Sequence, residues 1–261
     1  MNLSLEEKAY LIDEINKQTD NRPLFYLKFC KEIKFAQDVC DGNLFGNTAE
    51  HFRKLEEKSR KRGQGDKFET ILNFQTDNIT VMDRKTNEVL LIAPKGNFSV
   101  QYGVDKVIPI VSFVGIPFEQ MNIIEADETH ASFTLPFTEK EYTSMKEEFG
   151  QYCVIISGGE LETKIQNYCG LNGYEYIFGK VEYCKQNRID RIEAFNTGSK
   201  TRFLYKNEDL DYQREYRLAV GIEIPDDHFI RIGKISSTFI MKSEELKDLI
   251  FKLNYKSIKN S

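Results

Sequence analysis

The chain has 261 residues, of which 40% are hydrophobic and 30% charged, so it is long enough to bury a core without covalent or metal cross-links. Its formal net charge of -5 argues against a broadly basic nucleic-acid-binding surface, because contacts from Lys and Arg to phosphates dominate such binding. The five cysteines are widely spaced and form no C-x-x-C pair, so neither a disulfide framework nor a zinc site is expected.

The first 21 residues are charged and contain no apolar stretch of the kind found in secretory signals. No later segment approaches the ~20 apolar residues that a membrane span requires. The sequence therefore predicts a cytoplasmic protein that does not insert into a membrane. Within this first region, Ser4 and Glu7 have the spacing of a capping box, which predicts a helix over 4–17.

Apolar periodicity and turn residues predict the remaining elements. In the first half they predict a strand over 24–29, helices over 31–40 and 50–62, and strands over 71–75, 79–82, 89–93 and 107–115. In the second half they predict helices over 138–149, 160–171 and 243–253, and strands over 152–157, 174–184, 203–205 and 215–224. Short turns between the strands at 71–93 favour a meander.

Strands and helices alternate without a regular βαβ pattern, which favours an α+β fold with a largely antiparallel sheet. We expect one domain over 1–261, with the helices at 4–17 and 243–253 as flanking elements.

The most basic stretch runs from His51 to Lys67 and is interrupted by Glu56, Glu57 and Asp66. Its other cations are Arg53, Lys54, Lys58, Arg60, Lys61 and Arg62. Such a stretch fits a solvated helix face, which is the common case, and it also fits a local phosphate-binding surface. The residues alone leave both interpretations open.

Several catalytic signatures are absent, including the P-loop, the dinucleotide-binding glycine pattern, H-E-x-x-H and G-x-S-x-G. The histidines His51, His130 and His228 are far apart in the sequence, which predicts surface or structural roles for them. No tight carboxylate cluster indicates a magnesium-dependent nuclease.

The segment that remains runs from Asp211 to Val220, where a polar loop leads into a predicted strand. Because strand side chains alternate, Gln213, Glu215 and Arg217 are expected on one face. Tyr212, Arg214, Tyr216 and Leu218 are then expected on the other face. A carboxylate held rigidly between polar neighbours fits a catalytic group. An edge strand with an exposed ion pair explains the same pattern equally well.

Gln213-x-Glu215 at the entry to a strand resembles the Q-x-E motif of ADP-ribosyltransferases, which use NAD as a substrate. The resemblance implies an antiparallel split β-sheet with flanking helices. It implies that Glu215 hydrogen-bonds the nicotinamide ribose and stabilises the oxocarbenium-like sugar as nicotinamide leaves. Gln213 would orient the acceptor, and Tyr212 would stack on the substrate.

The same resemblance implies two further strands beside NAD. The middle strand offers Ser112, while the first strand offers Tyr26 and Lys28 where the family has Arg or His. The candidates for NAD binding are Tyr26, Lys28, Arg53, Asp66 and Ser112, and those for substrate binding are Tyr212, Arg217 and Arg62. No metal is implied.

A second resemblance covers roughly Leu24 to Ile240 and includes F-Y-L-K-F, G-D-K-F-E, F-L-Y-K and Y-Q-R-E-Y-R. This layout is similar to a group of bacterial and phage-associated proteins encoded beside defence genes. Together the resemblances predict a mono-ADP-ribosyltransferase that modifies RNA or DNA, as a bacterial defence or toxin–antitoxin effector with an antitoxin or other defence protein as partner. The alternatives are a non-enzymatic sensing or partner-binding protein of a phage-defence system, and a transferase acting on a protein Arg.

Overall fold

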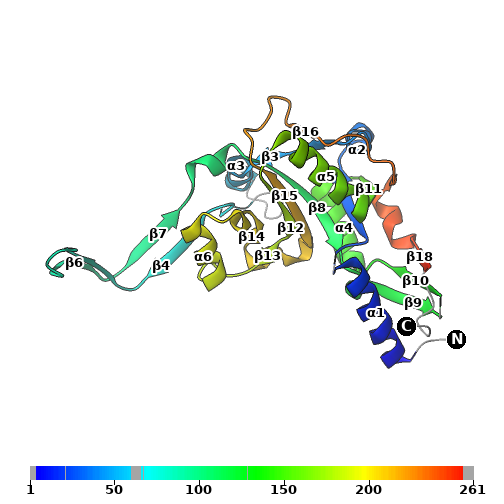
Figure 1. Cartoon of the computed structure of the whole chain (residues 1–261), viewed down its shortest axis with the longest axis horizontal. Helices are drawn as coiled ribbons and strands as arrows, with labels where there is room; N and C mark the ends of the chain where they lie inside the picture. The colour runs from blue at the N-terminus through cyan, green and yellow to red at the C-terminus, as the bar shows by residue number, and fades with distance from the viewer. Residues whose placement is uncertain (1–3, 21, 60–65, 67, 128, 255–261) are drawn as a thin grey trace.

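The computed structural model describes residues 4–20, 22–59, 66, 68–127 and 129–254. They form an α+β fold in which helices cover a central antiparallel sheet and a long hairpin arm projects from the body (Figure 1). The predicted α+β class and the antiparallel sheet are therefore confirmed. Among the described residues, no helix combines the length and the apolar composition needed to cross a membrane.

Six strands form the main sheet in the order β12-β15-β8-β1-β11-β17, and every neighbouring pair is antiparallel. They are β1 (Phe25–Cys30), β8 (Pro109–Ile116), β11 (Tyr152–Ser157), β12 (Tyr176–Lys180), β15 (Glu215–Val220) and β17 (Thr238–Lys242). The short β3 (Asn47–Thr48) pairs with the start of β8 and completes the sheet. β15, which comes late in the chain, thus lies beside β8, and β8 lies beside β1.

The sheet divides between its two central strands. β1 and β8 pair only from Phe25 with Ile116 to Leu27 with Val114. Beyond that point β1 remains paired with β11 as far as Cys30, while β8 remains paired with β15 back to Ile110. The two halves of the sheet therefore separate after Leu27, and the cavity described below lies at this separation.

Helices cover both faces of the main sheet. They are α1 (Leu5–Thr19), α2 (Ile33–Cys40), α3 (Ala49–Ser59), α4 (Glu139–Phe149), α5 (Gly158–Asn172) and α6 (Ile189–Thr197). α2 and α5 contribute to one apolar cluster, and α1 and α4 contribute to a second cluster on the opposite face. The capping boxes predicted at Ser4 with Glu7 and at Thr138 with Glu141 are both present.

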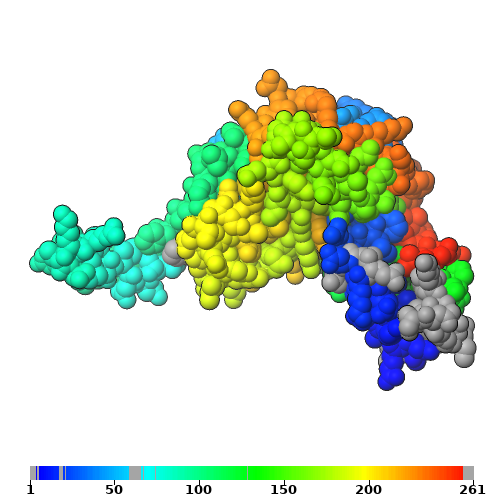
Figure 2. Space-filling view, in the orientation of Figure 1, coloured from blue at the N-terminus to red at the C-terminus, as the bar shows by residue number. Residues whose placement is uncertain are grey.

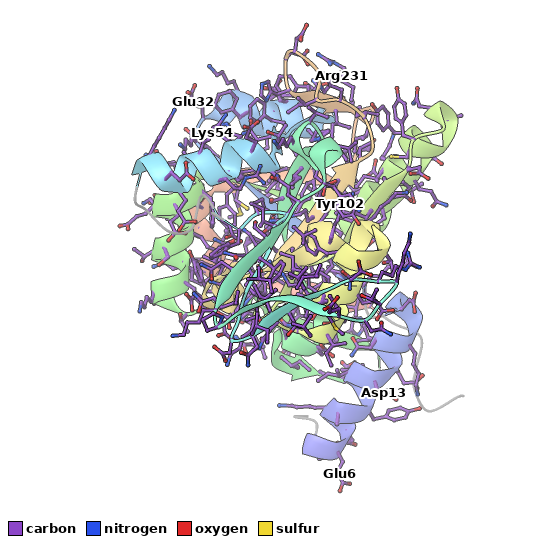
Figure 3. All side chains as sticks on the ribbon, turned by 90° about the vertical axis from the view of Figure 1, so that its left-hand side faces the viewer. Glu6, Asp13, Glu32, Lys54, Tyr102 and Arg231 are labelled. Atoms are coloured by element: carbon purple, nitrogen blue, oxygen red, sulfur yellow. The ribbon has the colours of Figure 1, made fainter. Side chains whose placement is uncertain are left out.

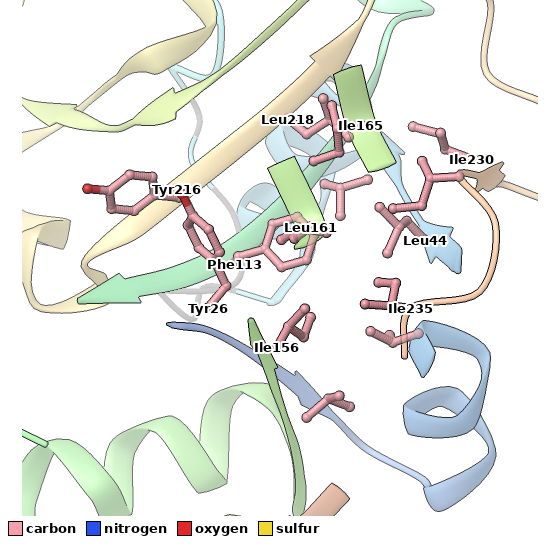
Figure 4. Packing of buried hydrophobic residues seen from close by; sticks show 14 of the residues in the cluster. Tyr26, Leu44, Phe113, Ile156, Leu161, Ile165, Tyr216, Leu218, Ile230 and Ile235 are labelled. Atoms are coloured by element: carbon pink, nitrogen blue, oxygen red, sulfur yellow. The ribbon is translucent and has the colours of Figure 1, made fainter. Parts of the chain in front are cut away.

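The first apolar cluster places aromatic rings between the sheet and α5 (Figure 4). The ring of Tyr26 lies 6.1 Å from that of Phe113 and 5.3 Å from that of Tyr216, centre to centre. Gly115 permits this packing, because a Cβ atom there would lie 2.3 Å from a ring carbon of Tyr216. These three rings therefore pack closely on one face of the central strands.

Smaller sheets and 3₁₀-helices complete the body. β2 (Asn43–Phe45) pairs with β16 (Phe229–Arg231), β13 (Glu182–Tyr183) pairs with β14 (Tyr205–Lys206), and β9 (Asn122–Ala126), β10 (His130–Thr134) and β18 (Phe251–Asn254) form a three-stranded sheet. The 3₁₀-helices are η1 (Gly103–Lys106), η2 (Phe118–Gln120), η3 (Lys200–Leu204), η4 (Glu208–Gln213) and η5 (Ser243–Asp248).

The predicted helix over 243–253 is wrong. Its first half is the 3₁₀-helix η5, and its second half is the strand β18. Phe251 and Leu253 alternate along β18 and pack against the second apolar cluster, where Phe251 stacks on Phe133 with 5.6 Å between ring centres. Pairing with β10 favours a strand here, because alternate side chains of a paired strand can pack on one face.

The predicted meander is also wrong. β4 (Leu72–Thr76) pairs with β7 (Gly96–Val100), and β5 (Ile79–Met82) pairs with β6 (Val89–Ala93). The four strands therefore form one long hairpin with two paired stretches. This hairpin is the arm that extends from the body in Figures 1 and 2.

Candidate functional site

A cavity of about 490 Å³ lies where β1 and β8 separate. Its polar lining residues come from β1, β8, β14, η4 and β15 and from the segment that precedes β4. They include Lys28, Asp66, Glu69, Ser112, Lys206, Gln213, Glu215 and Arg217. Its apolar lining includes Phe35, Phe45, Phe52, Leu55, Phe149 and Phe229. Ligand-binding pockets combine these features: a mostly apolar wall with a few convergent polar groups.

Glu215 is the first residue of β15, and its side chain is only 4% exposed. One carboxylate oxygen, Oε1, accepts hydrogen bonds from the Ser112 hydroxyl and from Arg217 Nε, the latter at 3.0 Å. The other oxygen, Oε2, accepts from Lys206 Nζ at 2.8 Å and from Arg217 Nη2 at 3.3 Å. Donors from three segments therefore fix the carboxylate.

The surroundings of Glu215 keep it ionised. Burial by itself raises the pKa of a carboxyl group, but the charges of Arg217 and Lys206 and the hydrogen bonds from Lys206 and Ser112 hold the pKa of Glu215 well below its usual range. At neutral pH the cavity therefore contains a fixed negative charge at a defined position.

Gln213 ends the 3₁₀-helix η4, immediately before Arg214 adopts a left-handed conformation with φ 45°. Gln213, Glu215 and Arg217 line the cavity, whereas Tyr216 and Leu218 pack into the apolar cluster behind the sheet. For these five residues the alternation is the one that the sequence predicts. Arg214 departs from it, because its guanidinium group lies 5.4 Å from the ring centre of Phe137, which belongs to the second apolar cluster. The alternative of an exposed edge strand is wrong, because β15 lies between β12 and β8 and all of its residues are buried.

Arg217 is 1% exposed and joins two carboxylates. In addition to its contacts with Glu215, Nη1 donates to Glu69 Oε1 at 2.6 Å and to the Phe203 carbonyl at 2.7 Å, and Nη2 donates to Glu69 Oε2 at 3.2 Å. These contacts occupy every N–H group of the guanidinium. Arg217 therefore holds Glu69 and Glu215 in place here, whereas the sequence predicts a contact with substrate.

Lys28 crosses the separation between β1 and β8. Its ammonium group donates to the Ser112 carbonyl at 2.7 Å and lies 5.2 Å from the centre of the Phe113 ring. Burial lowers the pKa of Lys28, and Glu215 is one of the groups that counteract this effect. The structure thus brings Lys28 and Ser112, two predicted NAD contacts, into the same cavity as Glu215.

Tyr26 does not line the cavity, although the sequence predicts a contact with NAD. The Tyr26 side chain points into the first apolar cluster, where the residue is 1% exposed. The Tyr26 hydroxyl donates to Glu162 Oε1 at 2.7 Å. Arg53 also does not line the cavity. It donates to the Glu69 carbonyl at 2.7 Å and so supports the backbone of a residue that does.

Asp66 lines the cavity and is 4% exposed. Its Oδ1 accepts from the Phe68 amide at 2.9 Å, while its buried Oδ2 has no hydrogen-bond partner among the described residues. Tyr212 donates to Glu148 Oε2 at 2.9 Å, and Glu148 in turn lines the cavity. The remaining candidate, Arg62, lies outside the described residues.

Two residues of the site were not singled out from the sequence: Glu69 and Lys206. Lys206 Nζ donates to both Gln213 Oε1, at 2.9 Å, and Glu215 Oε2, and Glu69 forms the ion pair with Arg217. Both residues occur in the sequence patterns F-L-Y-K and G-D-K-F-E that carry the second resemblance. Nothing in a pattern of that kind specifies which charges will pair.

Other features of the structure bear on the chemistry. Of the three histidines, only His51 lines the cavity. Within the described part of the chain, no group of three or more His, Cys, Asp or Glu side chains is arranged to hold a metal ion. All five cysteines are buried and free.

No protein-family model matches this sequence, and neither a curated protein nor a solved structure matches the chain.

Proposed function

We propose that this chain is an NAD-dependent mono-ADP-ribosyltransferase in which Glu215 stabilises the transition state. The observation that carries the proposal is the ionised Glu215 carboxylate, held by Ser112, Lys206 and Arg217 inside a cavity of about 490 Å³. The resemblance of Gln213-x-Glu215 to the family motif implies a split sheet with functional residues on its first, middle and late strands. Lys28, Ser112 and Glu215 on β1, β8 and β15 match that implication.

The proposed reaction breaks the bond between C1′ of a ribose and the ring nitrogen of nicotinamide. The bonding electron pair leaves with nicotinamide, and positive charge develops on the sugar. A nucleophilic atom of the acceptor then bonds to C1′ and loses its proton to water. Glu215 acts as a fixed negative charge, because a carboxylate whose pKa is held so low is a poor base.

The size and lining of the cavity support a dinucleotide substrate. Its volume falls within the range of ~300–1,000 Å³ that is typical of small-molecule sites. The rings of Phe45, Phe52 and Phe229 offer apolar surfaces against which a flat base can stack. Asp66 Oδ2, which has no hydrogen-bond partner in the described part of the chain, offers an acceptor to a ribose hydroxyl.

A nucleic-acid acceptor is supported by the position of α3. His51, Phe52 and Leu55 of this helix line the cavity, and the exposed cations Lys54 and Lys58 lie on the same helix. A phosphate backbone bound along α3 would run past the opening of the cavity. In that arrangement the chain would act as a defence or toxin–antitoxin effector controlled by a partner protein.

One observation favours the alternative of a non-enzymatic sensing protein. The Glu215 carboxylate already accepts hydrogen bonds from three side chains, so a ribose hydroxyl must displace or share one of these donors. A protein that binds a nucleotide without cleaving it does not need a free acceptor on Glu215, so the three existing hydrogen bonds can remain.

The test is to titrate the full chain with NAD and to follow nicotinamide release and transfer of labelled ADP-ribose to RNA, DNA and protein. We expect binding and release by the wild-type chain, and a loss of about 100–1,000-fold in rate for Glu215→Gln. Glu193→Gln, on the exposed side of α6, is the matched control and should retain full activity. Thermal unfolding shows whether each variant is folded.

If Glu215→Gln fails to fold, Gln213→Ala serves as the second variant, with the same expected loss of transfer. Binding of NAD without nicotinamide release would identify the sensing protein instead. Absence of NAD binding, or equal rates for wild type and Glu215→Gln, would reject the transferase.

A further inference from the structure

The arm formed by β4, β5, β6 and β7 exposes an unusual amount of apolar surface. Figure 2 shows it standing clear of the body. Its exposed apolar side chains are Val81 43%, Met82 51%, Val89 48%, Leu90 62%, Leu91 57%, Ile92 63%, Phe98 41% and Val100 38%. Four of them are consecutive on β6, so both faces of the hairpin are apolar, because neighbouring strand residues point to opposite faces. A contiguous surface of this kind marks an interaction site.

The base of the arm is firmly attached to the body. The Asn73 amide donates to Gln186 Oε1 at 3.1 Å, and the Tyr102 hydroxyl donates to the Phe195 carbonyl at 2.5 Å. Tyr102 is labelled in Figure 3, in which the arm points towards the viewer. Just beyond it, the buried Asp105 and Arg202 form a two-fold hydrogen-bonded ion pair. The inner part of the arm, β4 with β7, is therefore fixed to the body.

The outer part of the arm lacks a third strand. Among the described residues, β5 pairs only with β6, which leaves both outer edges of this hairpin open. An isolated two-stranded hairpin is marginally stable in water, and open edges pair readily with other strands. A second hairpin of the same kind, packed face to face on the first, would cover one apolar face of each hairpin.

The distribution of charge on the arm indicates the identity of the partner hairpin. Neither β5 nor β6 contains a charged residue. The charges lie at the two ends of the hairpin: Asp83, Arg84, Lys85 and Glu88 at the tip, and Asp77 and Lys95 where the outer and inner parts meet. Acids and bases are equal in number, so the arm as a whole is neutral.

We propose that the arm pairs with the arm of a second copy of this chain around a two-fold axis, so that the chain is a homodimer. In an antiparallel arrangement, the tip of one arm lies beside the base of the other hairpin. Asp77 then faces Arg84 of the second copy, Lys95 faces Glu88, and the uncharged strands lie against each other. A two-fold contact requires a self-complementary surface, and this charge pattern provides one. A neutral arm offers no comparable electrostatic attraction to a strongly charged foreign partner.

The first experiment measures the mass of the full chain by sedimentation equilibrium over a range of concentrations. We expect a dimer for wild type and at least a ~10-fold weaker dimer when Leu90→Glu and Ile92→Glu are combined, because the charges would be buried between arms. Leu171→Glu, at an 88% exposed apolar position on α5, is the matched control and should remain dimeric. A monomeric wild type, or an arm variant as dimeric as wild type, would overturn the proposal.

The second experiment tests the antiparallel geometry. Asp77→Lys and Arg84→Glu should each weaken the dimer, and the double variant should restore it. Because the five natural cysteines are buried, an introduced cysteine can be cross-linked selectively. Ile92→Cys, near the middle of the hairpin and on the same face as Leu90, should form a disulfide with itself, whereas Thr86→Cys at the tip should pair only with Asn78→Cys of another chain. Self-cross-linking of Thr86→Cys with no reaction of Ile92→Cys would overturn the arrangement.

Discussion

Lys206 and Glu215 form a buried ion pair, with 2.8 Å between Nζ and Oε2. The same ammonium group lies 2.9 Å from Gln213 Oε1. One cation therefore bridges the two residues of the Q-x-E motif and fixes the distance between their side chains.

Replacing Lys206 should change the pH dependence of the proposed reaction. Lys206→Met removes one of the two cations that lower the pKa of Glu215, so that pKa should rise. Glu215 would then take up a proton at a higher pH, and the acid limb of kcat/KM for NAD cleavage should move to higher pH. Lys185→Met, an exposed lysine, is the control. Identical profiles for both variants would show that Lys206 does not tune the carboxylate.

The buried ammonium group of Lys28 should lower the free energy of unfolding. Because burial lowers its pKa in the folded protein, the unfolded chain binds more protons at this position, and the free energy of unfolding rises with pH between the folded pKa and the ordinary value near 10.5. Lys28→Met should therefore raise the melting temperature at neutral pH and weaken its dependence on pH in that window. The gain is about 1 kcal/mol for each unit of pKa lowering. A variant that melts below wild type would contradict this.

Arg217 should couple strongly to Glu69. Arg217→Met leaves two buried carboxylates without their main partner, which should cost about 3–5 kcal/mol in the free energy of unfolding. In Glu69→Gln with Arg217→Met, the combined loss should be smaller than the sum of the single losses by roughly 0.5–3 kcal/mol. Urea unfolding of the four proteins measures this, and strictly additive losses would mean that the pair contributes nothing to stability.

Asp105 and Arg202 form a second buried ion pair, which lies outside the cavity and has a structural role. Arg202 donates to both carboxylate oxygens of Asp105, at 2.7 Å and 2.6 Å, and neither residue lines the cavity. Asp105→Asn should lower the melting temperature, because a buried guanidinium would lose its charge partner. Calorimetric NAD affinity, measured below the melting transition, should be unchanged. A large loss of affinity would indicate that the base of the arm communicates with the cavity.

The parts of the fold that follow from local interactions could be predicted from the sequence. The capping boxes at Ser4 and Thr138 are examples, because each one is complete within four residues. The common direction of Glu215 and Arg217 was predictable for the same reason, since it needs only the period of a strand.

What the sequence did not determine depends on partners that are distant along the chain. Glu69 and Arg217 are 148 residues apart, and their pairing depends on the fold as a whole. The same holds for the arm, where the turn residues after β4 allow a meander, but the pairing of β4 with β7 makes a single hairpin. At the C-terminal end, pairing with β10 overrides the helical pattern from Phe251 to Leu253.

The kink at Arg214 makes the segment before β15 intolerant of changes in length. Strand partners repeat every second residue, so the loss or gain of one residue there would exchange inward and outward side chains and carry the carboxylate of Glu215 into the aromatic core. Among homologous chains, the spacing from Lys206 to Arg217 should therefore stay constant.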